Sequence, residues 1–295
     1  MALISRRDAG KLLLAGSAGL WAVSRNGWAD EYINSVIRGV QIGAQSYSFR
    51  DRGLDACIEG FQAVGLGECE LFDGHVTPNL EGEELRKWWL TAPATHFHEV
   101  RAKFENAGVK LYAFTYAFRK GSTDQEIECG FRAAQAMGVK YITSSANVSM
   151  APRVDQYAQK YKIMVGFHGH DDTSNPDEFS TPDTFARAMK GASPYIGVNL
   201  DIGHFLAAGG DPVAYIREHH QKIVTLHIKD RKKNHGANMP FGQGDTPIKE
   251  VLCLLRDNQW RIPANIEYEY GEDKKLDTIE EVKKCYAYCR QALEG

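Results

Sequence analysis

Residues 138–167 read GVKYITSSANVSMAPRVDQYAQKYKIMVGF, and this stretch contains the pattern that decides the fold. A short apolar run at 141–145 precedes a helical pattern at 151–162, and a second apolar run follows at 163–167. Gly138-Val139 marks the return from the preceding helix. A strand, a helix and a second strand in this order are typical of a βαβ unit, whose two strands run parallel.

The same alternation repeats along the chain from residue 37 to the C-terminus. Strands are predicted at 40–48, 68–72, 110–118, 141–145, 163–167, 195–200, 223–228 and 263–268. Helices are predicted at 54–64, 97–107, 124–137, 151–162, 182–190, 212–221, 248–258 and 277–293, with a polar insertion at 73–96. Nearly continuous apolar strands indicate a parallel sheet that helices cover on its outside.

The repeats predict an α/β protein with a single (β/α)8 TIM barrel at residues 37–295. The alternative is a doubly wound open sheet, which usually carries a glycine-rich phosphate turn after its first strand. Here the first strand runs into Ser46-Tyr47-Ser48-Phe49-Arg50 instead, and this favours the closed barrel. The chain has 295 residues, and α/β barrels of roughly 250 residues are single domains.

The net charge of -3 does not indicate nucleic-acid binding, which typically requires a stripe of basic residues. We therefore expect a small-molecule substrate and no nucleic-acid partner.

Residues 1–31 are predicted to be an export signal that precedes the barrel. The segment resembles a twin-arginine signal, with matching positions at Ser5, Arg6, Arg7 and Lys11. Ala9-Gly10 departs from the pattern, which usually has Phe-Leu there. The apolar stretch is too short for a permanent membrane span, and small residues favour cleavage after Ala29, so we expect a periplasmic protein. The alternative is a basic, amphipathic helix packed on the barrel.

Histidines and carboxylates follow the last four predicted strands. They are His168, His170, Asp201, His204, His227, Asp230, Glu267 and Glu269, and Lys229 lies beside Asp230. The carboxyl ends of the strands of a (β/α)8 barrel meet at one face, so these side chains are expected to lie close together. A single histidine at a strand end is usually solvated or hydrogen-bonded, and it is the joint placement that indicates a site. Mixed imidazole and carboxylate donors suit Mn²⁺, Co²⁺, Zn²⁺ or Fe²⁺ better than Ca²⁺.

Four motifs resemble the sugar phosphate isomerase/epimerase superfamily of xylose-isomerase-like barrels. They are NLDIGHF at 199–205, LHIKDR at 226–231, FGQGDTP at 241–247 and Ile266-Glu267. The resemblance implies one divalent metal, held by Glu, Asp, His and Glu. We expect Mn²⁺ or Co²⁺ in preference to Zn²⁺ or Fe²⁺. The last three ligands carry over to Asp201, His227 and Glu267. His204 matches a histidine that contacts substrate hydroxyls.

The first glutamate of the family pattern does not carry over, because His168 stands in its place before His170. Epimerisation in the family uses two glutamates on opposite faces of the substrate, and only Glu267 is evident here. A similar His-x-His occurs in relatives that resemble inosose dehydratases.

The sequence therefore predicts a divalent-metal-dependent isomerase or epimerase that acts on a keto-sugar or related polyol through an enediolate. The alternatives are a lyase at the same metal site and a non-catalytic carbohydrate-binding barrel. A multi-zinc endonuclease is disfavoured because the strands at 40–48 and 110–118 contain no histidine.

Roles follow for the individual residues. The predicted catalytic groups are Glu267 as base and His168 or His170 as the second proton-transfer group. The predicted substrate-binding residues are His204, Lys229 and Glu70, and His168 is expected to complete the metal ligand set. The sequence determines neither the sugar nor the oligomeric state.

Overall fold

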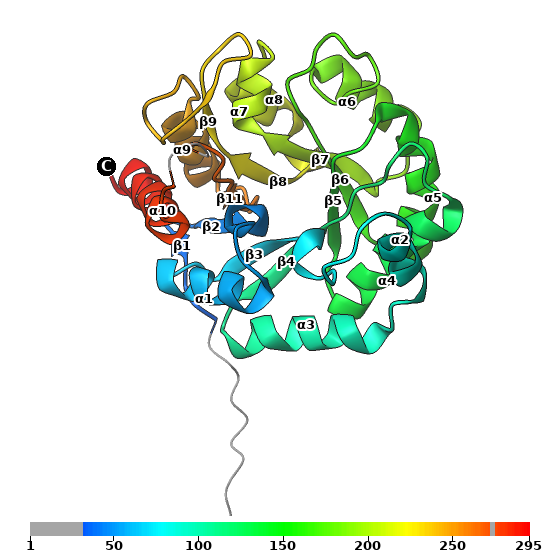
Figure 1. Cartoon of the computed structure of the whole chain (residues 1–295). Helices are drawn as coiled ribbons and strands as arrows, with labels where there is room; N and C mark the ends of the chain where they lie inside the picture. The colour runs from blue at the N-terminus through cyan, green and yellow to red at the C-terminus, as the bar shows by residue number, and fades with distance from the viewer. Residues whose placement is uncertain (1–31, 272–274) are drawn as a thin grey trace, which may run out of the picture. The chain divides into compact units, whose positions relative to one another are not determined.

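The computed structural model describes residues 32–271 and 275–295, so the predicted export signal and its cleavage near Ala29 lie outside the described residues. Eight parallel strands form a closed barrel, with helices around it (Figure 1). In sheet order the strands are β2 (Val40–Gln45), β11 (Ala264–Ile266), β8 (Ile223–Ile228), β7 (Ile196–Asp201), β6 (Met164–His168), β5 (Tyr141–Ser144), β4 (Lys110–Thr115) and β3 (Glu68–Phe72). Pairing of β2 with β3 closes the ring, which confirms the predicted TIM barrel and excludes the open sheet.

Each predicted helix is present, with bounds that shift by a few residues. The helices are α1 (Leu54–Val64), α2 (Gly82–Thr91), α3 (Ala94–Asn106), α4 (Asp124–Met137), α5 (Ala151–Tyr161), α6 (Pro182–Met189), α7 (Ile202–Ala207), α8 (Pro212–His219), α9 (Ile248–Asn258) and α10 (Thr278–Glu294). β1 (Val36–Ile37) pairs antiparallel with β2, and β9 (Asp230–Arg231) pairs with β10 (Asn238–Met239). Among the described residues, none of the helices has the length and apolarity that crossing a bilayer requires.

The interior of the barrel is polar just below the carboxyl ends of the strands. Glu70 of β3 forms hydrogen bonds there with side chains of other strands, among them Gln45, Thr143 and Asn199. The alternate residue Cys69 belongs instead to the apolar core. Apolar side chains commonly fill this part of a TIM barrel. Here the strands therefore supply a hydrogen-bonded floor beneath the site.

Two local structures differ from the prediction. The first strand ends at Gln45, because the Gln45 side chain accepts a hydrogen bond from the amide of Tyr47 at 3.1 Å and starts a 3-10 turn at Ser46–Phe49. The predicted strand at 195–200 and the helix at 212–221 are separated by an additional helix, α7, which begins directly after Asp201. Asp201 Oδ1 caps this helix by accepting hydrogen bonds from the amides of Gly203 (2.8 Å) and His204 (2.7 Å). The structure therefore gives Asp201 a capping role that the sequence did not reveal.

Candidate metal and active site

Four side chains converge at the carboxyl ends of neighbouring strands. His168 ends β6, Asp201 ends β7, His227 lies in β8 and Glu267 follows β11. One ligand atom from each lies within 4.8 Å of the others, and all four residues are buried. They are the four residues predicted to hold a metal, and the fold brings them together from positions up to 99 residues apart (267 − 168).

Hydrogen bonds orient both imidazoles toward the centre of this cluster. His168 Nδ1 lies 3.0 Å from Asn199 Oδ1, so Nδ1 donates and Nε2 keeps its lone pair. His227 Nε2 donates to Glu70 Oε1 at 2.8 Å, and Nδ1 lies 3.1 Å from Glu267 Oε2. Burial lowers the pKa of His227, but Glu70 and Glu267 outweigh burial and raise it well above its usual range. A metal-binding histidine typically donates its other ring nitrogen in this way. Nε2 of His168 is therefore free to bind a cation, whereas a cation bound at Nδ1 of His227 would replace the proton that lies between this nitrogen and Glu267.

Asp201 supplies a buried oxygen with no hydrogen bond. Its Oδ1 caps α7, whereas Oδ2 accepts no hydrogen bond from the described residues, although Lys229 Nζ lies 3.0 Å away. The ammonium of Lys229 compensates the charge of this buried oxygen, whose lone pairs accept no hydrogen bond from the described residues. Two imidazole nitrogens and two carboxylates form a donor set that fits a divalent transition metal.

Lys229, just after β8, has its ammonium among the carboxylates of the site. Nζ lies 2.7 Å from Glu267 Oε2 and 2.5 Å from Glu269 Oε2. Burial lowers the pKa of Lys229, but Asp201 and Glu267 outweigh burial and raise it well above its usual range. Burial raises the pKa of Glu267, but the charges of Lys229 and His227 outweigh that and hold it well below its usual range. Sequence reasoning did not assign Glu269 a role, although its spacing of two from Glu267 places it on the same side of the chain.

Glu70, predicted to bind substrate, lies at the centre of the polar floor. It is fully buried, and its Oε1 accepts hydrogen bonds from Thr143 Oγ1 (2.7 Å) and Asn199 Nδ2 (3.0 Å) as well as from His227. Its Oε2 accepts one from Asn265 Nδ2 at 3.0 Å. The contacts in the structure make Glu70 the partner that orients His227.

The remaining predicted residues, His204 and His170, each contact a carboxylate on the loop after β6. His204 Nε2 lies 3.0 Å from Lys229 Nζ, and its Nδ1 faces Arg231 Nη1 (2.6 Å) and Asp171 Oδ1 (3.4 Å). His170 Nδ1 lies 2.8 Å from Glu178 Oε1. Asp171 and Glu178 were missed by sequence reasoning, because loop residues show no periodicity that marks their direction.

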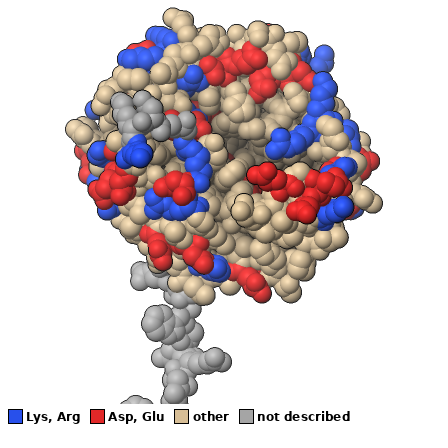
Figure 2. Space-filling model, viewed as in Figure 1, with Lys and Arg blue, Asp and Glu red and all other residues tan. Residues whose placement is uncertain are grey.

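These groups line a pocket of about 220 Å³ at the mouth of the barrel. Its lining residues are Gln45, Tyr47, Glu70, Phe72, Thr115, Thr143, Ser145, His168, His170, His204, His227, Lys229, Glu267 and Glu269. Figure 2 shows a hollow near the centre of the viewed face, bordered by acidic and basic side chains. The rings of Tyr47 and Phe72 pack edge to face, with centroids 5.0 Å apart, and form an aromatic wall.

The motif at 241–247 has a structural explanation. Asp230 Oδ2 accepts hydrogen bonds from the amides of Gly242 (2.7 Å) and Gly244 (2.9 Å), and Oδ1 accepts one from that of Thr246 (3.2 Å). A Cβ atom at Gly244 would lie only 1.9 Å from Asp230 Oδ1. Asp230 therefore holds the loop, and its neighbour Lys229 reaches the pocket.

Residues 62–288 match the family described as the xylose isomerase-like TIM barrel, and the chain belongs to this family. It is similar to an inosose dehydratase of Lactiplantibacillus plantarum, with 24% identity over 310 residues that cover 92% of this chain and 96% of that protein.

Two solved structures share the fold. The probable 3-DHS dehydratase AsbF of Bacillus anthracis, involved in petrobactin synthesis, has 15% identity and a TM-score of 0.63 over 83% of this chain and 98% of that one. The IolI protein, crystallised with a zinc atom, has 14% identity and a TM-score of 0.67 over 86% of this chain and 98% of that one. At these identities the likeness concerns the fold alone.

Proposed function

We propose that the protein is a divalent-metal-dependent lyase that eliminates water, or another leaving group, from a neutral keto-cyclitol or keto-sugar. The strongest support is the imidazole of His168 at the end of β6. The epimerases of the superfamily that this chain resembles have a glutamate at that position. Burial lowers the pKa of His168 well below its usual range, and the neighbouring His227 lowers it further. The β6 side of the cluster therefore offers a neutral ligand and no second carboxylate base.

Elimination needs one base at the carbon and one acid at the leaving group, and the pocket offers both. In this proposal Glu267 accepts the proton from the carbon next to the ketone. In this step His170 acts as the imidazolium: its Nδ1–H donates to Glu178, and its Nε2 proton passes to the leaving oxygen, which departs as water.

A bound divalent metal would stabilise negative charge on the substrate oxygens as the proton leaves. His168, Asp201, His227 and Glu267 would hold it, with Mn²⁺ or Co²⁺ expected before Zn²⁺ or Fe²⁺. Lys229 and His204, which are 3.0 Å apart, would donate to substrate oxygens on the same side of the pocket.

The pocket is suited to one neutral ring. Its volume of about 220 Å³ lies below the range of about 300–1,000 Å³ for drug-sized ligands. Among the described residues that line it, Lys229 is the only lysine or arginine, and three carboxylates accompany it. That charge balance disfavours a phosphate group, and the aromatic wall suits the C–H face of a polyol ring.

The test is incubation of the metal-loaded protein with keto-inositol and 3-keto-glycosides in D₂O. Elimination predicts a new conjugated double-bond absorbance together with product. The double variant Asp201→Ala/His227→Ala should lose both stoichiometric metal binding and turnover. Metal binding retained in that variant would refute the assigned site.

The second candidate is an epimerase or isomerase that acts through an enediolate. The presence of His170, next to His168 with ring centroids 4.8 Å apart, favours it, because this ring offers a proton-transfer group away from Glu267. Deuterium incorporation at carbon without a new double bond would support this reading over the lyase. Binding of a ring without exchange or product would support the non-catalytic barrel.

We also propose that residues 1–31 export the protein to the periplasm by a twin-arginine route. The support is the arginine pair with its flanking residues and the small residues before Ala29. Cell fractionation should find the mature chain outside the cytoplasm, and Arg6→Lys/Arg7→Lys should retain the precursor inside. A periplasmic variant protein would contradict the proposed route.

A further inference from the structure

The ammonium of Lys229 lies between two proposed metal ligands and a carboxylate that is not one of them. On one side, Nζ forms ion pairs with Asp201 Oδ2 at 3.0 Å and with Glu267 Oε2 at 2.7 Å. On the other side, Nζ donates to Glu269 Oε2 at 2.5 Å and lies 3.0 Å from His204 Nε2. The metal-binding group found among the described residues includes neither Glu269 nor His204.

Lys229 is buried and therefore needs a counter-charge inside the pocket. The residue is only 2% exposed, and a buried ammonium is costly unless a carboxylate neutralises it. More acceptors surround Nζ than the three protons of an ammonium can serve. Lys229 can therefore give up its contact with Asp201 and still be neutralised, provided that another carboxylate remains beside it.

A divalent cation competes with Lys229 for Asp201. Oδ1 of Asp201 caps α7, so Oδ2 is the oxygen that is left for a cation, and Lys229 lies beside that oxygen. Two cations at one oxygen repel each other, and a buried site screens this repulsion only weakly. Binding of the divalent cation therefore requires that the ammonium moves away from Asp201.

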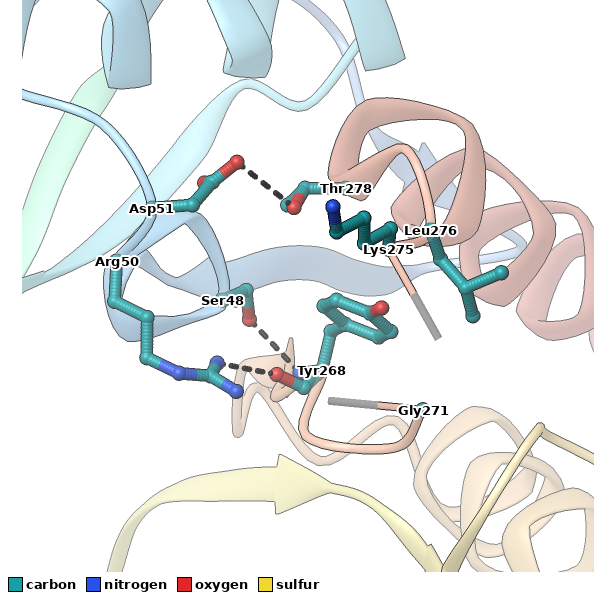
Figure 3. Close-up of a pocket in the computed structure, with 8 residues that line it drawn as sticks. All are labelled: Ser48, Arg50, Asp51, Tyr268, Gly271, Lys275, Leu276 and Thr278. Carbon is teal, nitrogen blue, oxygen red and sulfur yellow. Dashed lines mark hydrogen bonds between the residues drawn. The ribbon is translucent and has the colours of Figure 1, made fainter. Parts of the chain in front are cut away.

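The main chain holds Glu269 where its carboxylate can keep the ammonium. The preceding residue is fixed on both sides, because the Tyr268 amide donates to Ser48 Oγ at 2.9 Å and Arg50 Nη1 donates to the Tyr268 main-chain oxygen at 2.9 Å (Figure 3). The side chain of Glu269 borders the pocket and is 20% exposed. Glu269 is thus the carboxylate beside Lys229 that remains when the metal ligands are engaged.

We propose that Glu269 is a positioning residue that draws Lys229 away from the metal ligands. With a divalent cation on Asp201 and Glu267, the ammonium keeps its contacts with Glu269 and His204 and loses its contact with Asp201. Glu269 thereby retains Lys229 at the side of the pocket where it donates to substrate oxygens. This role rests on the metal site of the proposed function, whichever reaction takes place there.

The test is calorimetric titration of the metal-free protein with Co²⁺. Lys229→Met removes the competing charge and should tighten Co²⁺ binding about tenfold, whereas Glu269→Gln should weaken it about tenfold because the ammonium then stays with Asp201 and Glu267. In the Lys229→Met background, Glu269→Gln should change the dissociation constant by less than about threefold, because no ammonium remains to be drawn away. Glu269→Asp retains the charge and should restore most of the affinity.

The control is Glu178→Gln, the same exchange at a carboxylate that pairs with His170 and not with Lys229, and it should leave Co²⁺ affinity unchanged. A crystal structure of the Co²⁺-loaded wild type gives a readout that needs no variant. Lys229 should contact Glu269 there and no longer contact Asp201, and a retained contact with Asp201 would overturn the proposal.

The affinities separate this role from a general effect of charge and from the reaction itself. If Glu269→Gln weakens Co²⁺ binding equally with and without Lys229, or if Glu178→Gln weakens it as much, the positioning role is wrong. A wild type that binds no Co²⁺ would overturn both this role and the metal site of the proposed function. The predicted affinities in a protein that turns over no keto-sugar would support the role of Glu269 and refute the lyase alone.

Discussion

Replacing Glu70 by glutamine tests whether this residue orients the metal ligand His227 or binds substrate. The substitution keeps the size of the side chain but removes its charge, and one oxygen becomes an NH₂ group. Oε1 faces several donors, including His227 Nε2 at 2.8 Å, whereas Oε2 faces Asn265 Nδ2 alone. The NH₂ group will therefore take the place of Oε2.

The cost of the change can be worked out from these contacts. Asn265 Oδ1 has no partner among the described residues, so the Asn265 amide can turn over and accept from the new NH₂ group. The main loss is then the negative charge of the acceptor in the hydrogen bond from His227, which becomes a hydrogen bond to a neutral amide oxygen. A charge-assisted hydrogen bond contributes about 1.5–3 kcal/mol. Losing a partner of a metal-bound histidine typically weakens metal affinity about 10–100-fold, or about 1.4–2.7 kcal/mol.

We expect Glu70→Gln to raise the dissociation constant for Mn²⁺ or Co²⁺ about 10–100-fold, measured by calorimetry or chelator competition. The matched control is Glu68→Gln, the same exchange two residues earlier on β3, which should leave metal affinity unchanged. If Glu70→Gln binds metal as wild type does while KM rises, Glu70 binds substrate as the sequence predicted, and the orienting role is wrong.

Three further outcomes follow from single contacts. Burial raises the pKa of Glu68 to about 8. The protonated carboxyl therefore contributes its full stabilisation of the folded protein below the unfolded-state pKa near 4.5. This contribution is lost as the pH rises through 8. From pH 4 to pH 9, the free energy of unfolding of Glu68→Gln, measured in urea, should therefore rise by at least about 1 kcal/mol relative to that of the wild type. The same difference between variant and wild type at both pH values would contradict this prediction. Gly244→Ala should destabilise the protein by about 2–4 kcal/mol, because the new Cβ meets Asp230 Oδ1 at 1.9 Å, whereas Gly121→Ala, with nothing within 4 Å, should not. Thr123→Ala removes the capping box of α4 and should lower the free energy of unfolding by about 1 kcal/mol; an unchanged urea midpoint would refute that cap.

The alternation of apolar strands and amphipathic helices was sufficient to predict the barrel. Period and length are local properties, and the helices predicted at 182–190 and 212–221 do begin at Pro182 and Pro212 in the structure. The face that holds the site also followed from sequence, because all parallel strands end on the same side of a barrel. For this reason His168, Asp201, His227 and Glu267 were predicted together despite their separation along the chain.

The tertiary structure alone decided what each polar side chain contacts. Glu70 and Glu267 both line the pocket, yet Glu70 accepts hydrogen bonds from side chains of the barrel interior, whereas Glu267 pairs with Lys229. The loop carboxylates Asp171 and Glu178 reach His204 and His170 only through the path of the chain after β6. Periodicity fixes the side of a strand on which a residue lies, but hydrogen-bond partners depend on which strands become neighbours when the barrel closes. The sequence therefore determined the barrel and the location of its site, and the closure of the barrel determined the role that each residue has there.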